Sequence, residues 1–502
     1  YDWTSVPMRM LQYKGNCGDP SGRGGFKVGR ARKHQGRIKM SENTVSQQLA
    51  KFTLHLDLAK VPETVQSHAR LLFLDALGVG LAASKEQYSR IAAEVASSCG
   101  ESREATALGR TLKMPAVWAA LVNGIQIHGH DFDDTHSGSI AHTTSVIVPT
   151  VLSLGERQGL TGKEILTAAI GGLEATCRVG LASCGGFHTR GYHTTAIAGA
   201  MGGSLAASRC LELDVQRTVF SQGIAGSSAS GLREAYLSGG SWTKLYHPGW
   251  AAHAAIMAGL MAEKGFTGTS TVYEGRFGLF KSHLHPGDGD YDALLNGLGE
   301  SWELMNISFK PYPCGVINHA FIDLAIQLLD QHEFQSDEID SIIAFIHPDA
   351  AQTVCEPVET KRRPVSGYHA KFSLHFNVAA ALAEGKVDLT TYTDEKVLDT
   401  SILKLAEKIE HQCDNDSQYP KTYPAKMEIR LKDGRTFRGE IEHHKGSLKN
   451  PMKPEEVRQK FMANSKHVIG LGPSKLISEG ICQLEEHEDI EEIMGMLRKR
   501  IQ

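Results

Sequence analysis

The densest group of reactive side chains in the sequence is a run of nine residues between two apolar segments. The run reads His128-Gly-His-Asp-Phe-Asp-Asp-Thr-His136, and His142 follows it after a short gap. Histidine and aspartate side chains are suitable ligands for a divalent metal ion. They also perform acid–base chemistry without a metal, because imidazole exchanges a proton near neutral pH and a carboxylate holds its tautomer. Alternatively, Asp133, Asp134 and Thr135 cap the helices on either side. The residue types leave these three interpretations open.

Isolated basic residues follow in three later segments. His193 precedes a run of small residues that predicts a closely packed helix, so the imidazole faces the helix end where an anion also binds. Lys244 precedes a predicted turn and helix, and Lys310 stands between Phe309 and two prolines, with His319 on the next predicted helix. A single histidine of this kind is more often structural, and a single lysine is usually solvated. Together, two lysines and several histidines would form a pocket for a di- or tricarboxylate.

Motifs of other enzyme classes are absent from the sequence. It contains no Gly-x-x-x-x-Gly-Lys-Ser/Thr loop for phosphates, no Gly-x-Ser-x-Gly turn of a serine hydrolase and no His-Glu-x-x-His metalloprotease motif. The glycine- and serine-rich stretch 222–230 lacks both the spacing and the preceding strand of a phosphate loop. Nucleotide binding is therefore not expected.

Size and composition describe a globular protein of two or three domains. The chain has 502 residues, of which 41% are hydrophobic and 22% are charged. Its net charge of −4 gives no support for binding to nucleic acid or to a membrane surface. Nine cysteines occur without a Cys-x-x-Cys pair, which favours a reducing compartment. We expect a cytoplasmic location, with a mitochondrial one as the alternative.

Residues 1–40 differ from the rest of the chain. They contain nine lysines and arginines against two aspartates, are rich in glycine, and show little apolar periodicity. We expect this segment to be a disordered basic extension. A transit peptide is the alternative, although such peptides are usually amphipathic and rich in serine.

The remaining chain predicts two kinds of structure that must position these side chains. Apolar residues recur at helical spacing through residues 41–305, and Thr161-Gly-Lys-Glu164 forms a capping box before one such helix. Residues 306–445 add strands at Ile339–His347 and at Lys426–Phe437, the second around an Asp-Gly turn. Residues 446–502 are helical again and are expected to return to the first domain. The predicted fold class is mainly α, with a large all-helical domain and a smaller α+β domain.

Several segments, in the same order along the chain, resemble the MmgE/PrpD family. They are His130-Asp-Phe-Asp-Asp-Thr135 with His142, the segment around His193, Lys244 with His247-Pro-Gly-Trp-Ala-Ala-His253, Glu274-Gly-Arg-Phe-Gly278, and Phe309-Lys-Pro-Tyr-Pro313. The resemblance covers about residues 42–465. It implies a helical domain with an α+β lid, a homodimer, and no metal or other cofactor.

The resemblance also implies a lyase, such as 2-methylcitrate dehydratase or cis-aconitate decarboxylase, that acts on a small polycarboxylate. His142 would then exchange the proton and Asp131 would orient it, while His193 assists and Lys244 and Lys310 hold carboxylates. The residues expected to contact the substrate are Thr135, His136 and His319. The same residues could instead serve an epimerase of a dicarboxylate. A non-catalytic protein that binds carboxylates is the alternative of a different class.

Overall fold

The computed structural model describes residues 43–111, 113–237 and 241–498. The predicted disorder of residues 1–40 lies outside the described residues. The first part of the described chain is helical, with the longer helices α1 Val45–His55, α2 Glu63–Ala83, α3 Gln87–Ser98, α4 Ala116–His128, α5 Thr144–Gln158, α6 Gly162–Ala182, α8 Thr194–Cys210, α9 Val215–Gly226 and α11 Thr243–Glu263. Shorter helices lie between and after them: α7 Gly186–Thr189, α10 Glu234–Leu237, α12 Leu279–His283 and α13 Tyr291–Leu295.

Glycine allows the helices of this part to pack closely. A Cβ atom at Gly202 of α8 would lie 2.0 Å from Thr176 Oγ1 of α6, and one at Gly249 of α11 would lie 2.5 Å from the Leu121 carbonyl oxygen of α4. Any larger residue would push these helix pairs apart, so the contacts offset the low helix propensity of glycine. The predicted close packing of the small-residue helix is confirmed.

Helix α6 shows how local sequence sets an element of this core. The Thr161 hydroxyl accepts from the Glu164 amide, while the Glu164 carboxylate accepts from the Thr161 amide at 2.8 Å, so the predicted capping box is present. The helix is long and apolar enough to cross a membrane by those two criteria, but 94% of its apolar window is buried inside the fold. It is a core helix of the helical part.

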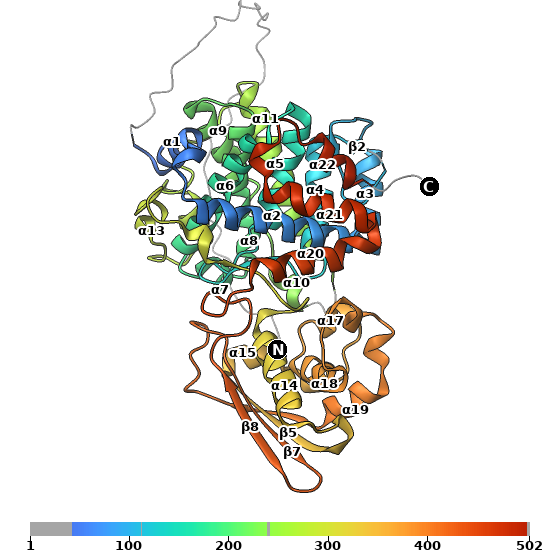
Figure 1. Cartoon of the computed structure of the whole chain (residues 1–502). Coiled ribbons are helices and arrows are strands. Elements are labelled where there is room, and N and C mark those ends of the chain that lie inside the picture. The colour runs from blue at the N-terminus through green and yellow to red at the C-terminus, as the bar shows by residue number, and fades with distance from the viewer. Residues whose placement is uncertain (1–42, 112, 238–240, 499–502) are drawn as a thin grey trace, which may run out of the picture. The chain divides into compact units, whose positions relative to one another are not determined.

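The α+β part packs helices against a four-stranded sheet. Its helices are α14 His319–His332, α15 Pro348–Val354, α16 Val358–Arg362, α17 Gly367–Ala370, α18 Leu374–Glu384 and α19 Thr400–Glu407. The sheet has the order β6-β5-β7-β8, where β6 is Ile409–Cys413, β5 is Ile339–Ile346, β7 is Ala425–Leu431 and β8 is Thr436–Ile441. Strands β5 and β6 are parallel, and the other two pairs are antiparallel. Figure 1 shows α14 beside this sheet, where residues such as Phe321 and Leu324 join Ile342 and Ile429 in one buried core.

The two predicted strand regions are confirmed as β5 and as the hairpin of β7 and β8. Gly434 occupies the turn with φ 91°, a conformation that favours glycine. Strand β6 was not predicted, because most of its side chains are exposed and only Ile409 is buried, so no alternation marks it. The fold class predicted from the sequence, mainly α with a smaller α+β part, is confirmed.

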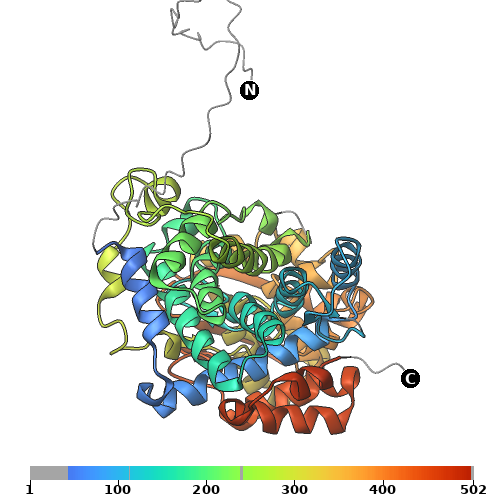
Figure 2. The same cartoon turned by 90° about the horizontal axis from the view of Figure 1, so that it is seen from above.

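The C-terminal helices are α20 Pro454–Ile469, α21 Leu471–Cys482 and α22 Glu491–Met496. Both α20 and α21 pack against α2, and Figures 1 and 2 show these red helices alongside the blue α2. The Lys460 ammonium of α20 lies 2.8 Å from Asp75 Oδ1 of α2. The C-terminal helices therefore pack against a helix from the start of the described chain.

Two small antiparallel pairs complete the fold. Strand β1 (Ala105–Thr106) pairs with β2 (Lys113–Met114), and β3 (Thr135–His136) pairs with β4 (Ile307–Ser308). The sequence placed residues 306–445 in the smaller domain, but the pairing with β3 keeps β4 with the helical part. The crossing into the α+β part therefore comes between β4 and α14.

Candidate active site

The loop between α4 and α5 carries the polar run, and Asp134 fixes its far end. The two Asp134 carboxylate oxygens accept hydrogen bonds from the backbone amides of Thr143 and Thr144, each at 3.0 Å, and from both threonine hydroxyls. Asp134 therefore anchors the start of α5, where the helix end favours negative charge. The structural interpretation of the polar run applies to this residue.

Asp131 is held by two lysines from distant parts of the chain. Lys244 Nζ contacts Asp131 Oδ1, and Lys310 Nζ lies 3.1 Å from Asp131 Oδ2 and 2.9 Å from the Asp131 carbonyl oxygen. All three residues are buried. Although burial by itself raises the pKa of the Asp131 carboxyl, Lys244 and Lys310 lower this pKa well below its usual range. Asp131 therefore stays ionised, in a backbone conformation with φ 52° that is uncommon for a residue other than glycine.

The pairing of β3 with β4 brings Lys310 to this carboxylate. Thr135 pairs with Ser308, and the Ser308 hydroxyl donates to the Thr135 carbonyl at 2.9 Å. Lys310 follows β4 by two residues, so its direction is set by a pairing between segments 173 residues apart. Lys244 reaches Asp131 from the first turn of α11, which begins at Thr243. The expectation that Lys244 precedes a turn and helix is therefore wrong, because the helix starts earlier and includes Pro248.

Three imidazole rings gather beside the lysine pair. The ring centroids of His128 and His142 are 4.7 Å apart, and His193 lies 5.6 Å from the first and 6.0 Å from the second. His128 Nδ1 is 2.8 Å from Asp133 Oδ2, and His142 Nδ1 is 2.8 Å from the Asp134 carbonyl oxygen. These acceptors require a proton on each Nδ1 and leave Nε2 unprotonated in the neutral ring.

Burial keeps these rings neutral. It lowers the pKa of His142 to about 3, an effect that the Asp133 charge opposes only in part. Burial also lowers the pKa of His128 and of His193 well below the usual value. His142 keeps 14% of its side chain exposed, whereas His128 is fully buried. His142 is thus a neutral imidazole with part of its side chain exposed to solvent.

The carboxylate beside His142 differs from the one expected. Asp131 binds the two lysines, while Asp133 Oδ1 lies 3.7 Å from His142 Nδ1. Asp133 and the Asp134 carbonyl oxygen therefore orient the ring. Sequence reasoning did not select His128, although it lies in the same run, or His247, whose Nδ1 is 3.1 Å from that of His193. Both belong to segments that the sequence analysis singled out, but nothing there showed which of the neighbouring histidines meet at the site.

The other predicted contact residues have different environments. The Thr135 hydroxyl is buried and has no hydrogen-bond partner among the described residues, so it is available to a ligand. His136 Nδ1 lies 2.8 Å from the Ser139 hydroxyl, and His319 Nε2 lies 3.2 Å from the Cys314 carbonyl oxygen. Both histidines therefore have local partners, and the structure does not place either ring against the His142 and His193 rings.

The three imidazoles are close enough together to hold a metal ion. His128, His142 and His193 each offer a ring nitrogen, and these atoms lie within 4.8 Å of one another. Burial is the largest cause of the lowered pKa of all three rings, and the positive charge of Lys244 acts in the same direction on each of them. The adjacent pair of Lys244 and Lys310 is the feature of this arrangement that favours a small anion.

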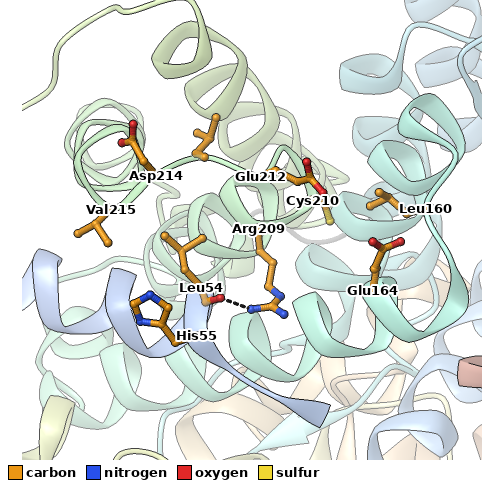
Figure 3. A pocket seen from close by; sticks show the side chains of 10 residues that line it. Leu54, His55, Leu160, Glu164, Arg209, Cys210, Glu212, Asp214 and Val215 are labelled. Atoms are coloured by element: carbon orange, nitrogen blue, oxygen red, sulfur yellow. Dashed lines mark hydrogen bonds between the residues drawn. The ribbon is translucent and has the colours of Figure 1, made fainter. Parts of the chain in front are cut away.

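A separate cavity of about 490 Å³ lies elsewhere in the helical part (Figure 3). It is lined by residues including Leu54, Glu164 and Arg209, and the Arg209 guanidinium donates to the Leu54 carbonyl at 2.6 Å. Its lining includes none of the residues described above for the site. The chemistry of the site therefore does not extend into this cavity.

Comparisons with known proteins match nearly the whole described chain. The model of the MmgE/PrpD N-terminal domain matches residues 47–291, and that of the MmgE/PrpD C-terminal domain matches residues 312–482. The chain is 25% identical to a cis-aconitate decarboxylase-like protein, oryM, of Aspergillus oryzae, over 91% of this chain and 98% of that protein. It is 24% identical to the cis-aconitate decarboxylases of Mus musculus and Homo sapiens, over 91% of this chain and 94% and 95% of theirs.

Proposed function

The chain belongs to the MmgE/PrpD family, and we propose that it is a lyase that removes CO₂ or water from a small polycarboxylate. The observation that carries the proposal is the buried contact of Lys244 and Lys310 with one carboxylate, beside the neutral and accessible ring of His142. Two ammonium groups held by one carboxylate leave positive charge for an anionic substrate. Relatives named as cis-aconitate decarboxylases support decarboxylation as the first candidate.

In a decarboxylation, the two lysines would bind substrate carboxylates and stabilise the negative charge that develops as the C–CO₂ bond breaks. The electron pair of that bond passes to the carbon, which then takes up a proton. His142 is neutral in the free protein, so it must first gain this proton. A bound polyanion raises the pKa of a neighbouring imidazole, and substrate binding would therefore charge His142.

Dehydration is the second candidate, because a neutral imidazole is already in the form that removes a proton. His142 would take the proton from the carbon next to the carboxylate and deliver it to the hydroxyl on the neighbouring carbon, which then leaves as water. Thr135, with its unpartnered buried hydroxyl, would bind the substrate in either reaction.

Product analysis separates these candidates. The purified protein is incubated with cis-aconitate, citrate and 2-methylcitrate, and the products are followed by mass in ordinary and deuterated water. A loss of CO₂ identifies the decarboxylase, a loss of water the dehydratase, and deuterium uptake without mass loss an epimerase. Turnover should persist after exhaustive chelation. No product and no deuterium uptake with any of these acids would contradict the proposed function.

A further inference from the structure

A pair of histidines links the imidazole rings of the site to helix α11. His247 Nδ1 lies 3.1 Å from His193 Nδ1, and the two ring centroids are 5.3 Å apart. His193 is the residue before α8, whereas His247 lies on α11 one turn after Lys244, which contacts Asp131. One turn of α11 therefore reaches both the charged groups of the site and its histidines. No step of the proposed reactions uses His247.

Gly231 fixes the positions of both members of this pair. Its carbonyl oxygen accepts from the His193 amide at 2.7 Å. A Cβ atom at Gly231 would lie 3.1 Å from His247 Cγ and 3.2 Å from His247 Nδ1, so the glycine packs closely against the ring. His247 is 5% exposed and His193 is 1% exposed. The fold around the two buried rings therefore holds their Nδ1 atoms against each other.

Both rings of the pair are neutral. Burial and then the positive charge of Lys244 lower the pKa of His247 to about 4. Burial also lowers the pKa of His193 well below its usual value, and the charge of Lys244 acts in the same direction. A neutral imidazole carries one proton, on either Nδ1 or Nε2. Because the two Nδ1 atoms face each other, one ring must donate from Nδ1, while the other accepts there and has its proton on Nε2.

The other two rings of the site indicate which member of the pair donates. His128 Nδ1 and His142 Nδ1 are both protonated, because they lie against Asp133 and the Asp134 carbonyl oxygen. Each of these rings therefore offers only the lone pair of Nε2 to a ligand. One nitrogen of each ring and one of His193 lie within 4.8 Å of one another. The cluster thus already contains two acceptors beside His193.

A third lone pair would be unfavourable in this cluster. His128 Nε2 is a buried acceptor without a hydrogen-bond partner among the described residues. Since Nδ1 of His193 faces His247, Nε2 is the nitrogen that His193 can offer to a substrate. A proton on this Nε2 avoids the repulsion between lone pairs and supplies a donor, which the oxygen atoms of an acidic substrate need.

We propose that His247 is a positioning residue, which donates from Nδ1 to His193 Nδ1 and so fixes the His193 proton on Nε2. His193 then enters the site as a hydrogen-bond donor to a substrate oxygen, whereas His142 enters it as an acceptor. The inference rests on the proposed function for the presence of a substrate at these rings. The positions of the two protons do not depend on which acid is the substrate.

The protons are located by ¹⁵N NMR of the full chain at neutral pH, with labelled histidine rings in a deuterated protein. Protonated and unprotonated ring nitrogens have well-separated shifts, and the signals lost in His193→Gln and in His247→Asn identify the two residues. We expect a protonated Nε2 and an unprotonated Nδ1 for His193, and the reverse for His247. In His247→Leu the two His193 shifts should move toward each other, because both tautomers become populated. A protonated His193 Nδ1 in the wild type, or unchanged His193 shifts in His247→Leu, would overturn the inference.

Turnover of the accepted acid tests the consequence for the site. Leucine and asparagine have similar volumes, but only asparagine can donate to His193 Nδ1. His247→Leu should therefore reduce kcat/KM by about tenfold or more, whereas His247→Asn should stay within about threefold of the wild type. Equal losses in the two variants would show that His247 only fills space, and would overturn the inference.

His253→Asn is the matched control, because it replaces another buried imidazole of α11 whose Nδ1 lies 3.0 Å from the Val117 carbonyl oxygen. This variant should retain the wild-type kcat/KM and the wild-type His193 shifts. If none of the acids is turned over, the proposed function is contradicted. The NMR measurement on the wild-type protein still decides the position of the His193 proton in that case, and also if a variant does not fold.

Discussion

At the scale of single residues, the candidate site places its fixed charges and its neutral imidazoles on different groups. Asp131 stays ionised because two lysines contact it, and this pairing leaves Asp133 as the carboxylate beside His142. The imidazole itself is neutral, since burial lowers its pKa to about 3. A substrate that brings negative charge would raise this pKa and make His142 both base and acid within one reaction.

Replacement of His142 by Gln should reduce turnover about a hundredfold or more, the usual contribution of a general acid or base. Glutamine preserves much of the volume and can donate to the Asp134 carbonyl oxygen, so thermal stability should change little. Saturating rates and melting curves of the variant and the wild type measure both effects. A folded variant with more than about half the wild-type turnover would show that His142 does not transfer the proton, and His193 would be tested next.

Lys371→Met should raise the stability of the free protein. Burial lowers the pKa of Lys371 to about 8, and the charge of Lys310 acts in the same direction. Asp131, Cys314 and Glu86 oppose this shift only in part. The unfolded chain therefore binds the lysine proton more tightly than the folded chain, and wild-type stability should rise with pH from about 8 to 10.5. At pH 7 the variant should gain about 0.5–2 kcal/mol, because a buried ammonium is costly to desolvate.

Denaturant unfolding at pH 7 and at pH 10 measures this difference. The advantage of the Lys371→Met variant should be largest at pH 7 and should shrink at the higher pH, where wild-type Lys371 is neutral. A variant that is less stable than the wild type at pH 7 would show that the Lys371 ammonium stabilises the fold and is not held at a cost.

At the scale of secondary-structure elements, short strand pairings position side chains of the site that lie outside the helices. Strands β3 and β4 contain two residues each, yet they place Lys310 against Asp131. Helix α20 acts in a similar way from the other end of the chain. Lys460 pairs with Asp75 of α2 and donates to the carbonyl of Phe132, the residue after Asp131. The loop of the site is therefore supported by a helix that contributes no catalytic group.

Lys460→Met should destabilise the protein by about 3–5 kcal/mol at pH 8, because it leaves the buried Asp75 without its partner. Burial raises the pKa of Asp75 to about 6, and Lys460 moderates this rise. Asp75 becomes protonated as the pH falls through this value, so the ion pair is lost in the wild type as well. The difference in stability between the two proteins should therefore be smaller at pH 5.

Denaturant unfolding of both proteins at pH 5 and pH 8 tests the Lys460 prediction. Arg458 lies on the same helix with an exposed side chain, so Arg458→Met serves as the control for the loss of a cation from α20. The control variant should change stability by no more than about 0.5 kcal/mol. A Lys460→Met penalty that is equal at both pH values would contradict the role assigned to its pairing with Asp75.

At the scale of the whole molecule, helices from the two ends of the described chain pack against each other in the helical part. Helix α2 packs against α4 in the helical part and against α20 near the C-terminus. The α+β part has a core of its own around α14 and α18. Lys310 comes from the crossing between the two parts, whereas the histidines come from the helical part. The site therefore depends on the position of this crossing as well as on the helices.

A chain that begins at Met40 should fold with a free energy of unfolding within about 0.5 kcal/mol of the full chain. Residues 1–40 lack the apolar pattern that a packed segment needs, and their glycine and arginine content favours solvation. Denaturant unfolding and turnover of the two proteins measure the difference. A large loss of stability on truncation would show that the segment packs against the rest.

The sequence by itself determined the helices, the hairpin of β7 and β8, and the identity of most site residues. These features depend on local signals: apolar periodicity, the Thr161 capping box, the Asp-Gly turn and a run of histidines and aspartates. Only the tertiary structure decided which acidic group meets which basic one. Asp131, Asp133 and Asp134 are nearly adjacent and chemically alike, yet one binds lysines, one orients histidines and one caps a helix. The lysines that distinguish Asp131 come from segments more than a hundred residues away, so no local pattern in the sequence assigns them to it.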